Sequence, residues 1–236
     1  MGSTLDPRFD VEKRKVTTMN VKHFSVLAGG AAMLLASTAS AGFNGLSYDI
    51  VAVDGVDGAP PHWTARIYAD LGAGNRLDAV YGNGSNPLTM GTTSSLYQNA
   101  FGGDTTTAIN PALYAAFPSL VYDSWVTIGL EDQVGNALSS IGMNFGADEV
   151  STSDGSFYVT PDDAQGEEVG GRVLIAQFTS MDYDSKLVGT ISMQGKLADG
   201  SNWTAESVSY EFALPAPGAL ALLGLAGIAG RRRRRA

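Results

Sequence analysis

Apolar and polar side chains alternate along most of the chain beyond residue 45. The alternating segments are residues 46–52, 63–71, 120–130, 187–193 and 204–212. A period of two is typical of strands that bury one face and leave the other in water. Residues 172–179, RVLIAQFT, are apolar on both faces and therefore predict a central strand.

Turn sequences separate these segments. They include Asn83-Gly84, Asp154-Gly155 and Asp199-Gly200, and further turns are expected at Asp57-Gly58, Gly102-Gly103 and Gly135-Asn136. One segment, residues 110–117, predicts a short helix, because Asn110 is a good N-cap and Pro111 suits the first helical position. Many short strands and one short helix predict a single all-β domain over residues 42–214, an antiparallel β-sandwich or a jelly-roll-like fold.

Residues 19–41 have the pattern of a secretory signal peptide. Lys22 precedes an apolar run over residues 24–36, and Ala39 and Ala41 form the small-residue cleavage pattern. We expect signal peptidase to cut after Ala41, which leaves Gly42 as the first residue of the mature chain. Residues 1–18 are a polar, charged upstream extension, and translation is expected to start at Met19.

We expect the last 22 residues to form a second segment that is removed from the mature protein. Pro215, Ala216 and Pro217 precede thirteen apolar residues, 218–230, and then Arg231, Arg232, Arg233, Arg234 and Arg235. A helix of that length spans about 20 Å, which is short for a hydrocarbon core of roughly 30 Å. The arginines should stay on the cytoplasmic side. Because the apolar run is this short, we expect the C-terminal helix to associate with the membrane only transiently.

These three elements, in this order, resemble the PEP-CTERM sorting signal of Gram-negative-type bacteria. The resemblance implies that a membrane-embedded exosortase cleaves near the proline motif and releases or attaches the protein at the cell surface. Ala216 stands where that signal has Glu, so the cleavage point is left open. An ordinary tail anchor and a C-terminal helix of the fold are the alternatives. The predicted location is secreted or cell-surface, reached through a membrane-anchored precursor.

The domain between these ends resembles an uncharacterised family of exported bacterial proteins. The stretches that carry this resemblance are RIYADL (66–71), DAVYGN (78–83), LYQNAFGG (96–103), INP (109–111), YDSWVTIGL (122–130), SFYVTPDDAQG (156–166) and RVLIAQFT (172–179). The resemblance implies a coherent domain and assigns no activity to any residue.

Charge and cysteine content exclude several classes of function. Residues 42–217 contain five cationic and 21 acidic residues, a net charge near −16. Such a surface repels nucleic acid, so no nucleic-acid partner is expected. The sequence has no cysteine, which excludes thiolate metal sites and cysteine catalysis.

Catalytic signals are sparse. His62 is the only histidine after residue 41, so a multi-histidine zinc site cannot form, and no Gly-x-Ser-x-Gly motif supplies a nucleophile. Paired carboxylates for glycoside hydrolysis remain open, because acidic residues are abundant. We expect a protein that is not an enzyme.

Calcium is the candidate cofactor, and no other is expected. Asp154, Asp162, Asp163 and Glu167 are loop acids of the kind that supply oxygen ligands to calcium, although their spacing does not fit an EF-hand.

Two aromatic residues are candidates for ligand binding. Trp125 and Tyr68 fall at polar positions of their predicted strands, so we expect both to be exposed, where aromatic rings could stack on sugars. The leading hypothesis is a structural or adhesive protein of the cell surface or extracellular matrix. The alternatives are a carbohydrate-binding module that contacts extracellular polysaccharide and a secreted hydrolase with paired carboxylates.

Overall fold

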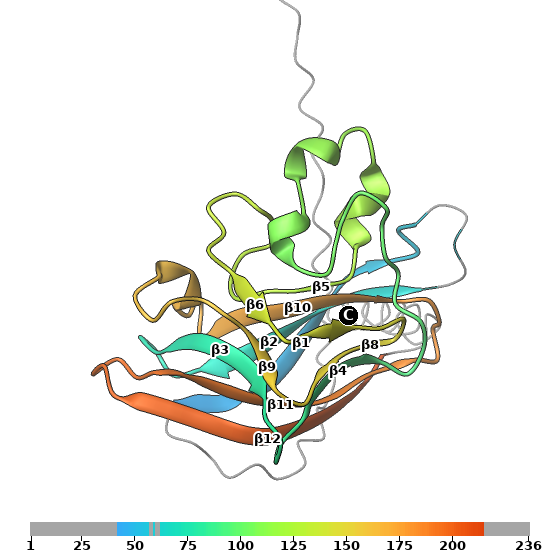
Figure 1. Cartoon of the computed structure of the whole chain (residues 1–236). Helices are drawn as coiled ribbons and strands as arrows, with labels where there is room; N and C mark the ends of the chain where they lie inside the picture. The colour runs from blue at the N-terminus through green and yellow to red at the C-terminus, as the bar shows by residue number, and fades with distance from the viewer. Residues whose placement is uncertain (1–41, 57–58, 60–61, 215–236) are drawn as a thin grey trace, which may run out of the picture.

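Strand β10 (Arg172–Ser180) lies inside a four-stranded antiparallel sheet, as its apolar sequence predicts. The strand order is β1–β2–β10–β5, with β1 (Phe43–Val53), β2 (Trp63–Leu71) and β5 (Trp125–Val126). Every residue of β10 after Arg172 is buried. The computed structural model describes residues 42–56, 59 and 62–214 (Figure 1).

A second, eight-stranded antiparallel sheet is organised around β11 (Lys186–Lys196). Its order is β6–β9–β3–β11–β4–β8–β7, and β12 (Asn202–Ala213) pairs with the full length of β11. The remaining strands are β3 (Arg76–Gly82), β4 (Leu88–Thr92), β6 (Ser139–Ile141), β7 (Asn144–Phe145), β8 (Glu149–Thr152) and β9 (Gly155–Tyr158). Strands β3 and β4 share the other side of β11, each pairing with one half of it.

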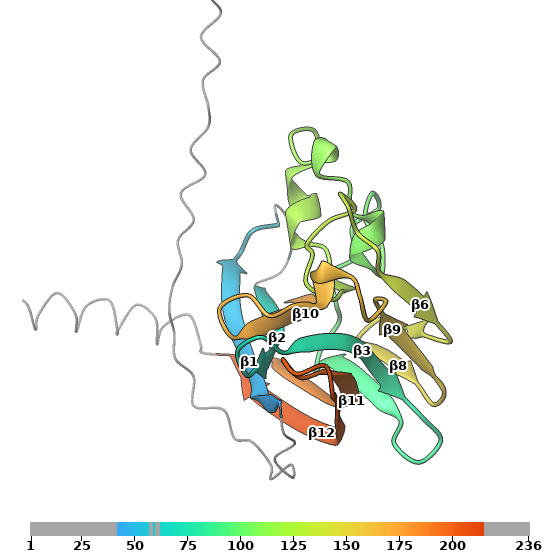
Figure 2. The ribbon, with the colours of Figure 1, turned by 90° about the vertical axis from the view of Figure 1, so that its left-hand side faces the viewer.

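The two sheets pack face to face around one hydrophobic core (Figure 2). Trp63, Ile67 and Phe178 enter it from the smaller sheet, and Phe157 and Phe212 enter it from the larger one. All five are at most 2 % exposed. The prediction of an all-β domain built from antiparallel sheets is confirmed.

A lobe (residues 97–138), which contributes β5, lies over the four-stranded sheet on the side away from the larger sheet (Figures 1 and 2). It contains three short 3-10 helices, η1 (Thr106–Ala108), η2 (Pro111–Leu113) and η3 (Pro118–Tyr122), and η4 (Ala164–Gly166) follows β9. Asn110 caps η2 as predicted, because its side chain accepts a hydrogen bond from the Ala112 N–H at 3.0 Å. The helix predicted within residues 110–117 is therefore present as η2, but the prediction of only one helix is wrong, because the described chain has four 3-10 helices. None of its helices is long and apolar enough to cross a membrane.

The strand predicted over residues 120–130 is wrong except at β5. Only Trp125 and Val126 pair with β10. Before them, side chains of β10 replace the backbone ladder: Gln177 Nε2 donates to the carbonyls of Val121 and Asp123, and Thr179 Oγ1 donates to that of Tyr122. Residues 121–123 therefore cross over β10 and do not run alongside it as a paired strand.

A β-bulge in β12 interrupts the alternation predicted over residues 204–212. Between the pairs Ile191–Val208 and Met193–Ala205, two residues of β12 oppose one of β11, and Ser207 has φ +50°. A bulge shifts the period by one residue. Trp203 and Ala205 are therefore buried before the bulge, with Thr204 exposed, and Val208, Tyr210 and Phe212 are buried after it.

Candidate functional site

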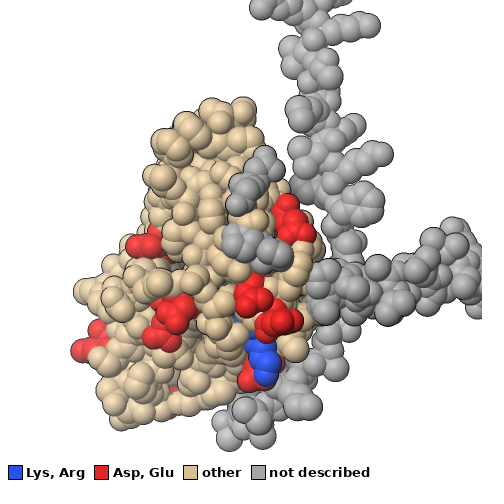
Figure 3. Space-filling model, turned by 90° about the vertical axis from the view of Figure 1, so that its right-hand side faces the viewer, with Lys and Arg blue, Asp and Glu red and all other residues tan. Residues whose placement is uncertain are grey.

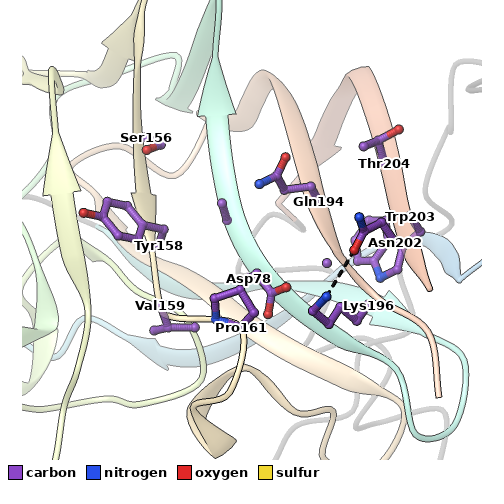
Figure 4. A pocket seen from close by; sticks show the side chains of 12 residues that line it. Asp78, Ser156, Tyr158, Val159, Pro161, Gln194, Lys196, Asn202, Trp203 and Thr204 are labelled. Atoms are coloured by element: carbon purple, nitrogen blue, oxygen red, sulfur yellow. Dashed lines mark hydrogen bonds between the residues drawn. The ribbon is translucent and has the colours of Figure 1, made fainter. Parts of the chain in front are cut away.

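A groove of about 490 Å³ lies on the outer face of the eight-stranded sheet, where β3, β9, β11 and β12 run side by side (Figure 4). Its polar lining is formed by Asp78, Ser156, Tyr158, Gln194, Lys196, Asn202 and Thr204. Ala79, Val159, Pro161, Gly195 and Trp203 complete it.

The period of two places these polar side chains in the groove. On β9, Phe157 is buried in the core while Ser156 and Tyr158 point outward. On β12, Trp203 is buried between the exposed Asn202 and Thr204. The sequence contains this signal, but it does not say that β9 and β12 lie on either side of β3 and β11.

The floor of the groove depends on one glycine. A Cβ atom at Gly195 would clash with the Arg76 carbonyl oxygen. At this point the pairing of β3 with β11 shifts register, and Trp203 Nε1 donates to the same carbonyl at 3.0 Å. The absent side chain lets β3 and β11 approach closely.

Two of the residues that line the groove are charged. Asp78 is paired with Arg76 through an Nε–Oδ1 contact of 2.6 Å, and both side chains are nearly buried. The Nη2 of Arg76 also donates to the carbonyls of Thr160 and Asp163. This ion pair therefore fixes the loop after β9. Lys196 Nζ donates to Asn202 Oδ1 at 3.2 Å.

The exposed groups of the groove are suited to a ligand rich in hydroxyls. Tyr158 is 38 % exposed, and Gln194, Asn202 and Thr204 are exposed beside it. Amide and hydroxyl groups can both donate and accept hydrogen bonds. An aromatic ring adds a flat apolar face to them.

The expectation that Trp125 is exposed is wrong. Trp125 is 3 % exposed and packs with Ile109, Leu120 and Leu174 beneath the lobe. Tyr68 is partly buried against the same cluster, and the Arg172 guanidinium lies 4.0 Å from its ring centroid. Burial raises the pKa of the Tyr68 hydroxyl. Both residues do leave the core, but the lobe covers the face to which they point.

The loop acids predicted for calcium act in part as backbone caps. Asp163 Oδ1 accepts from the Gln165 N–H at 2.9 Å at the start of η4, and Glu167 lies in an isolated bridge with Arg76. Asp162 is exposed just before η4, and Asp154 is exposed in the β8–β9 turn. The described part of the chain has no group of three or more acidic or histidine side chains placed to hold a metal ion. Calcium binding stays a prediction.

His62 holds the connection between β1 and β2. It is 1 % exposed, and its Nε2 accepts from the Val56 N–H at 3.0 Å. Its Nδ1 lies 4.0 Å from Asp54 Oδ1. The Tyr183 hydroxyl donates to the other oxygen of Asp54. These contacts give His62 a structural role at the turn.

Gly42, the expected first residue of the mature chain, lies directly before β1. Its carbonyl accepts from the Gly72 N–H and from Asn75 Nδ2, both at 3.2 Å. The other residues of the predicted processing sites, which are Ala39, Ala41, Pro215, Ala216, Pro217 and Arg231–Arg235, lie outside the described residues, as does the Asp57-Gly58 turn.

The chain matches no family model, no curated protein and no solved structure. The groove and its charges are therefore the basis for a functional proposal. Acidic side chains outnumber basic ones on the face of the domain in Figure 3, so the surroundings of any site on that face are electronegative.

Proposed function

We propose that this protein is a non-enzymatic component of the cell surface or extracellular matrix, and that its groove binds extracellular polysaccharide. The observation that carries the proposal is the open groove on the outer sheet face, where the exposed Tyr158 lies among amide and hydroxyl side chains. Sugar rings present hydroxyl groups at their edges and apolar C–H groups on their faces. An exposed ring next to hydrogen-bonding side chains is complementary to both.

The two ends of the chain supply the export route in this proposal. Signal peptidase would release the chain at Gly42, and an exosortase would process it near Pro215 and Pro217, so that a jelly-roll-like domain reaches the surface. The absence of cysteine means that this domain needs no disulfide formation after export.

The groove gives less support to the hydrolase alternative. Glycoside hydrolysis commonly uses two carboxylates on opposite sides of the scissile bond, roughly 5–10 Å apart. Asp78 is the one carboxylate among the residues that line the groove, and its partner is Arg76. The hydrolase alternative would therefore need a second acid from elsewhere.

Affinity measurements with polysaccharides test the binding proposal. We would measure binding of the full-length chain to a panel of soluble plant and bacterial polysaccharides, with Tyr158→Ala and the control Phe101→Ala. Phe101 is 48 % exposed on the lobe, so the control removes a comparable aromatic side chain away from the groove. Tyr158→Ala should weaken binding about tenfold or more. Equal losses in the two variants, or no binding to any polymer, would contradict the proposal.

The processing route has its own test. Mass spectrometry of the exported product should give an N-terminus at Gly42 and a C-terminus that precedes the apolar run of residues 218–230. A mature product that retains the five C-terminal arginines would exclude exosortase processing.

A further inference from the structure

Lys196 differs from every other cationic residue of the described chain in its contacts. Arg66, Arg76, Arg172 and Lys186 each form an ion pair with a carboxylate at 2.6 Å, with Glu131, Asp78, Asp49 and Glu211 respectively. Lys196 has no carboxylate within 4.0 Å among the described residues, and its hydrogen-bond partner is the neutral Asn202 side chain. The cation without an ion pair is thus the one that lines the groove.

The groove consequently carries a local positive charge in a strongly acidic domain. Its carboxylate, Asp78, is neutralised by Arg76, which lies at 2.6 Å. An ammonium group has three N–H donors, and Asn202 accepts from one of them. Figure 4 shows Lys196 and Asn202 together at one side of the groove, with Gln194 above them.

We propose that the polysaccharide held in the groove carries carboxylate groups, as uronic acids do, and that Lys196 pairs with one of them. This inference rests on the proposed function and names the chemical class of its ligand. A carboxylate would complete the coordination of Lys196 with a charge-assisted hydrogen bond, while Gln194 and Thr204 bind neighbouring hydroxyls.

The charge of the domain also limits how densely the polymer is charged. With 21 acidic and five cationic residues over 42–217, the domain repels a continuous polyanion beyond the immediate reach of Lys196. The fitting ligand therefore carries isolated carboxylates on an otherwise neutral backbone.

The experiment compares acidic polymers with their own neutral derivatives. Glucuronoxylan and highly esterified pectin would each be used in native form and after reduction of the carboxyl groups to alcohols, with the full-length chain in solution. Native polymer should bind about tenfold more tightly than its reduced form at low salt, and added salt should narrow the difference. Lys196→Gln should remove the difference, whereas Lys196→Arg should retain it. Lys186→Gln, on the same strand but outside the groove, is the matched control and should behave as wild type.

Each other outcome has a definite meaning. If reduced and native polymers bind equally well to the wild type, or if Lys196→Gln keeps its preference for the acid form, the carboxylate inference is overturned while polysaccharide binding stands. If no polymer binds at all, both the carboxylate inference and the proposed function are overturned. Melting temperatures of all variants are compared, and Lys196→Arg separates loss of charge from loss of fold.

Discussion

The two sheets of this domain differ in their outer faces: the lobe covers that of the four-stranded sheet, and the groove leaves that of the eight-stranded sheet open to solvent. On the four-stranded sheet, Tyr68, Leu174 and Gln177 point away from the core, yet Leu174 and Gln177 are buried, at 6 % and 1 % exposed, and Tyr68 is partly buried. On the eight-stranded sheet, Tyr158, Gln194 and Thr204 also point away from the core and remain exposed around the groove. Alternation along a strand thus reports which side chains leave the sandwich core. It does not report which of them reach water.

The largest expected effect comes from removing the aromatic side chain at the centre of the covered face. Trp125→Ala should lower the free energy of unfolding by about 3–5 kcal/mol, because a large side chain is lost from a closed cluster that cannot fully collapse. Tyr158→Ala on the open face should cost less than about 1 kcal/mol. Urea unfolding of both variants measures the two values. Equal losses would mean that the lobe does not shield Trp125 in solution.

A pH titration tests how the lobe is closed around its buried acid. Asp123 is 0 % exposed, and its carboxylate accepts from the Asn99 N–H at 2.6 Å and the Gly103 N–H at 2.9 Å. A Cβ at Gly102 would clash with the same carboxylate, so the loop fits closely around it. Burial raises the pKa of Asp123 from 3.8 to about 6, although the backbone hydrogen bonds oppose the shift.

The sign of the pH effect follows from that shift. Because the folded state holds the proton more tightly than the unfolded state, the contribution of Asp123 to stability is fully present below about pH 4. It is lost as the pH rises through about 6, and the loss amounts to about 3 kcal/mol. The free energy of unfolding, measured by heat or urea, should therefore fall more steeply between pH 4 and pH 7 for wild type than for Asp123→Asn, whose side chain at position 123 does not titrate. Parallel pH profiles would contradict the raised pKa.

Much of the sandwich could be predicted from the sequence, because its strands are long and regular. The segments predicted at residues 63–71 and 172–179 match β2 and β10 closely, and the turns at Asn83-Gly84, Asp154-Gly155 and Asp199-Gly200 join strands as expected. These features depend on local pattern and turn chemistry alone.

The errors arise where distant segments decide the outcome. The polar pattern around Trp125 indicates an exposed ring, but the lobe supplies Ile109 and Leu120 to cover it. The groove likewise combines β3, β9 and the β11–β12 hairpin, which lie far apart in the sequence, and Gly195 alone gives no sign that β3 and β11 approach closely there. A period of two carries no information about such neighbours.

The core beneath the open face contains an unpaired polar atom. Within the described residues, Tyr210 Oη is the one buried side-chain polar atom without a hydrogen-bond partner, whereas Asp123 and Gln177 under the lobe are fully engaged. Desolvation raises the pKa of Tyr210. Tyr210→Phe should therefore stabilise the domain by about 1 kcal/mol, because it removes an unsatisfied hydroxyl and keeps the stacking on Phe212. Differential scanning calorimetry measures the change, and a clear loss of stability would show that the hydroxyl has a partner in solution.

The smallest expected effect comes from removing an ion pair between the lobe and β2, which tests whether charge or packing attaches the lobe. Arg66 on β2 forms two hydrogen bonds of 2.6 Å with Glu131 of the lobe, but the Glu131 side chain is 53 % exposed. An exposed ion pair contributes about 0–1 kcal/mol, so Glu131→Gln should cost less than about 1 kcal/mol. Glu211→Gln, which breaks the similarly exposed pair with Lys186 on the larger sheet, is the matched control and should cost about as much. A loss above about 2 kcal/mol for Glu131→Gln alone would mean that the ion pair holds the lobe. A small and equal loss in both variants would leave the buried cluster around Trp125 as the interaction that keeps one face of the sandwich covered while the other stays open.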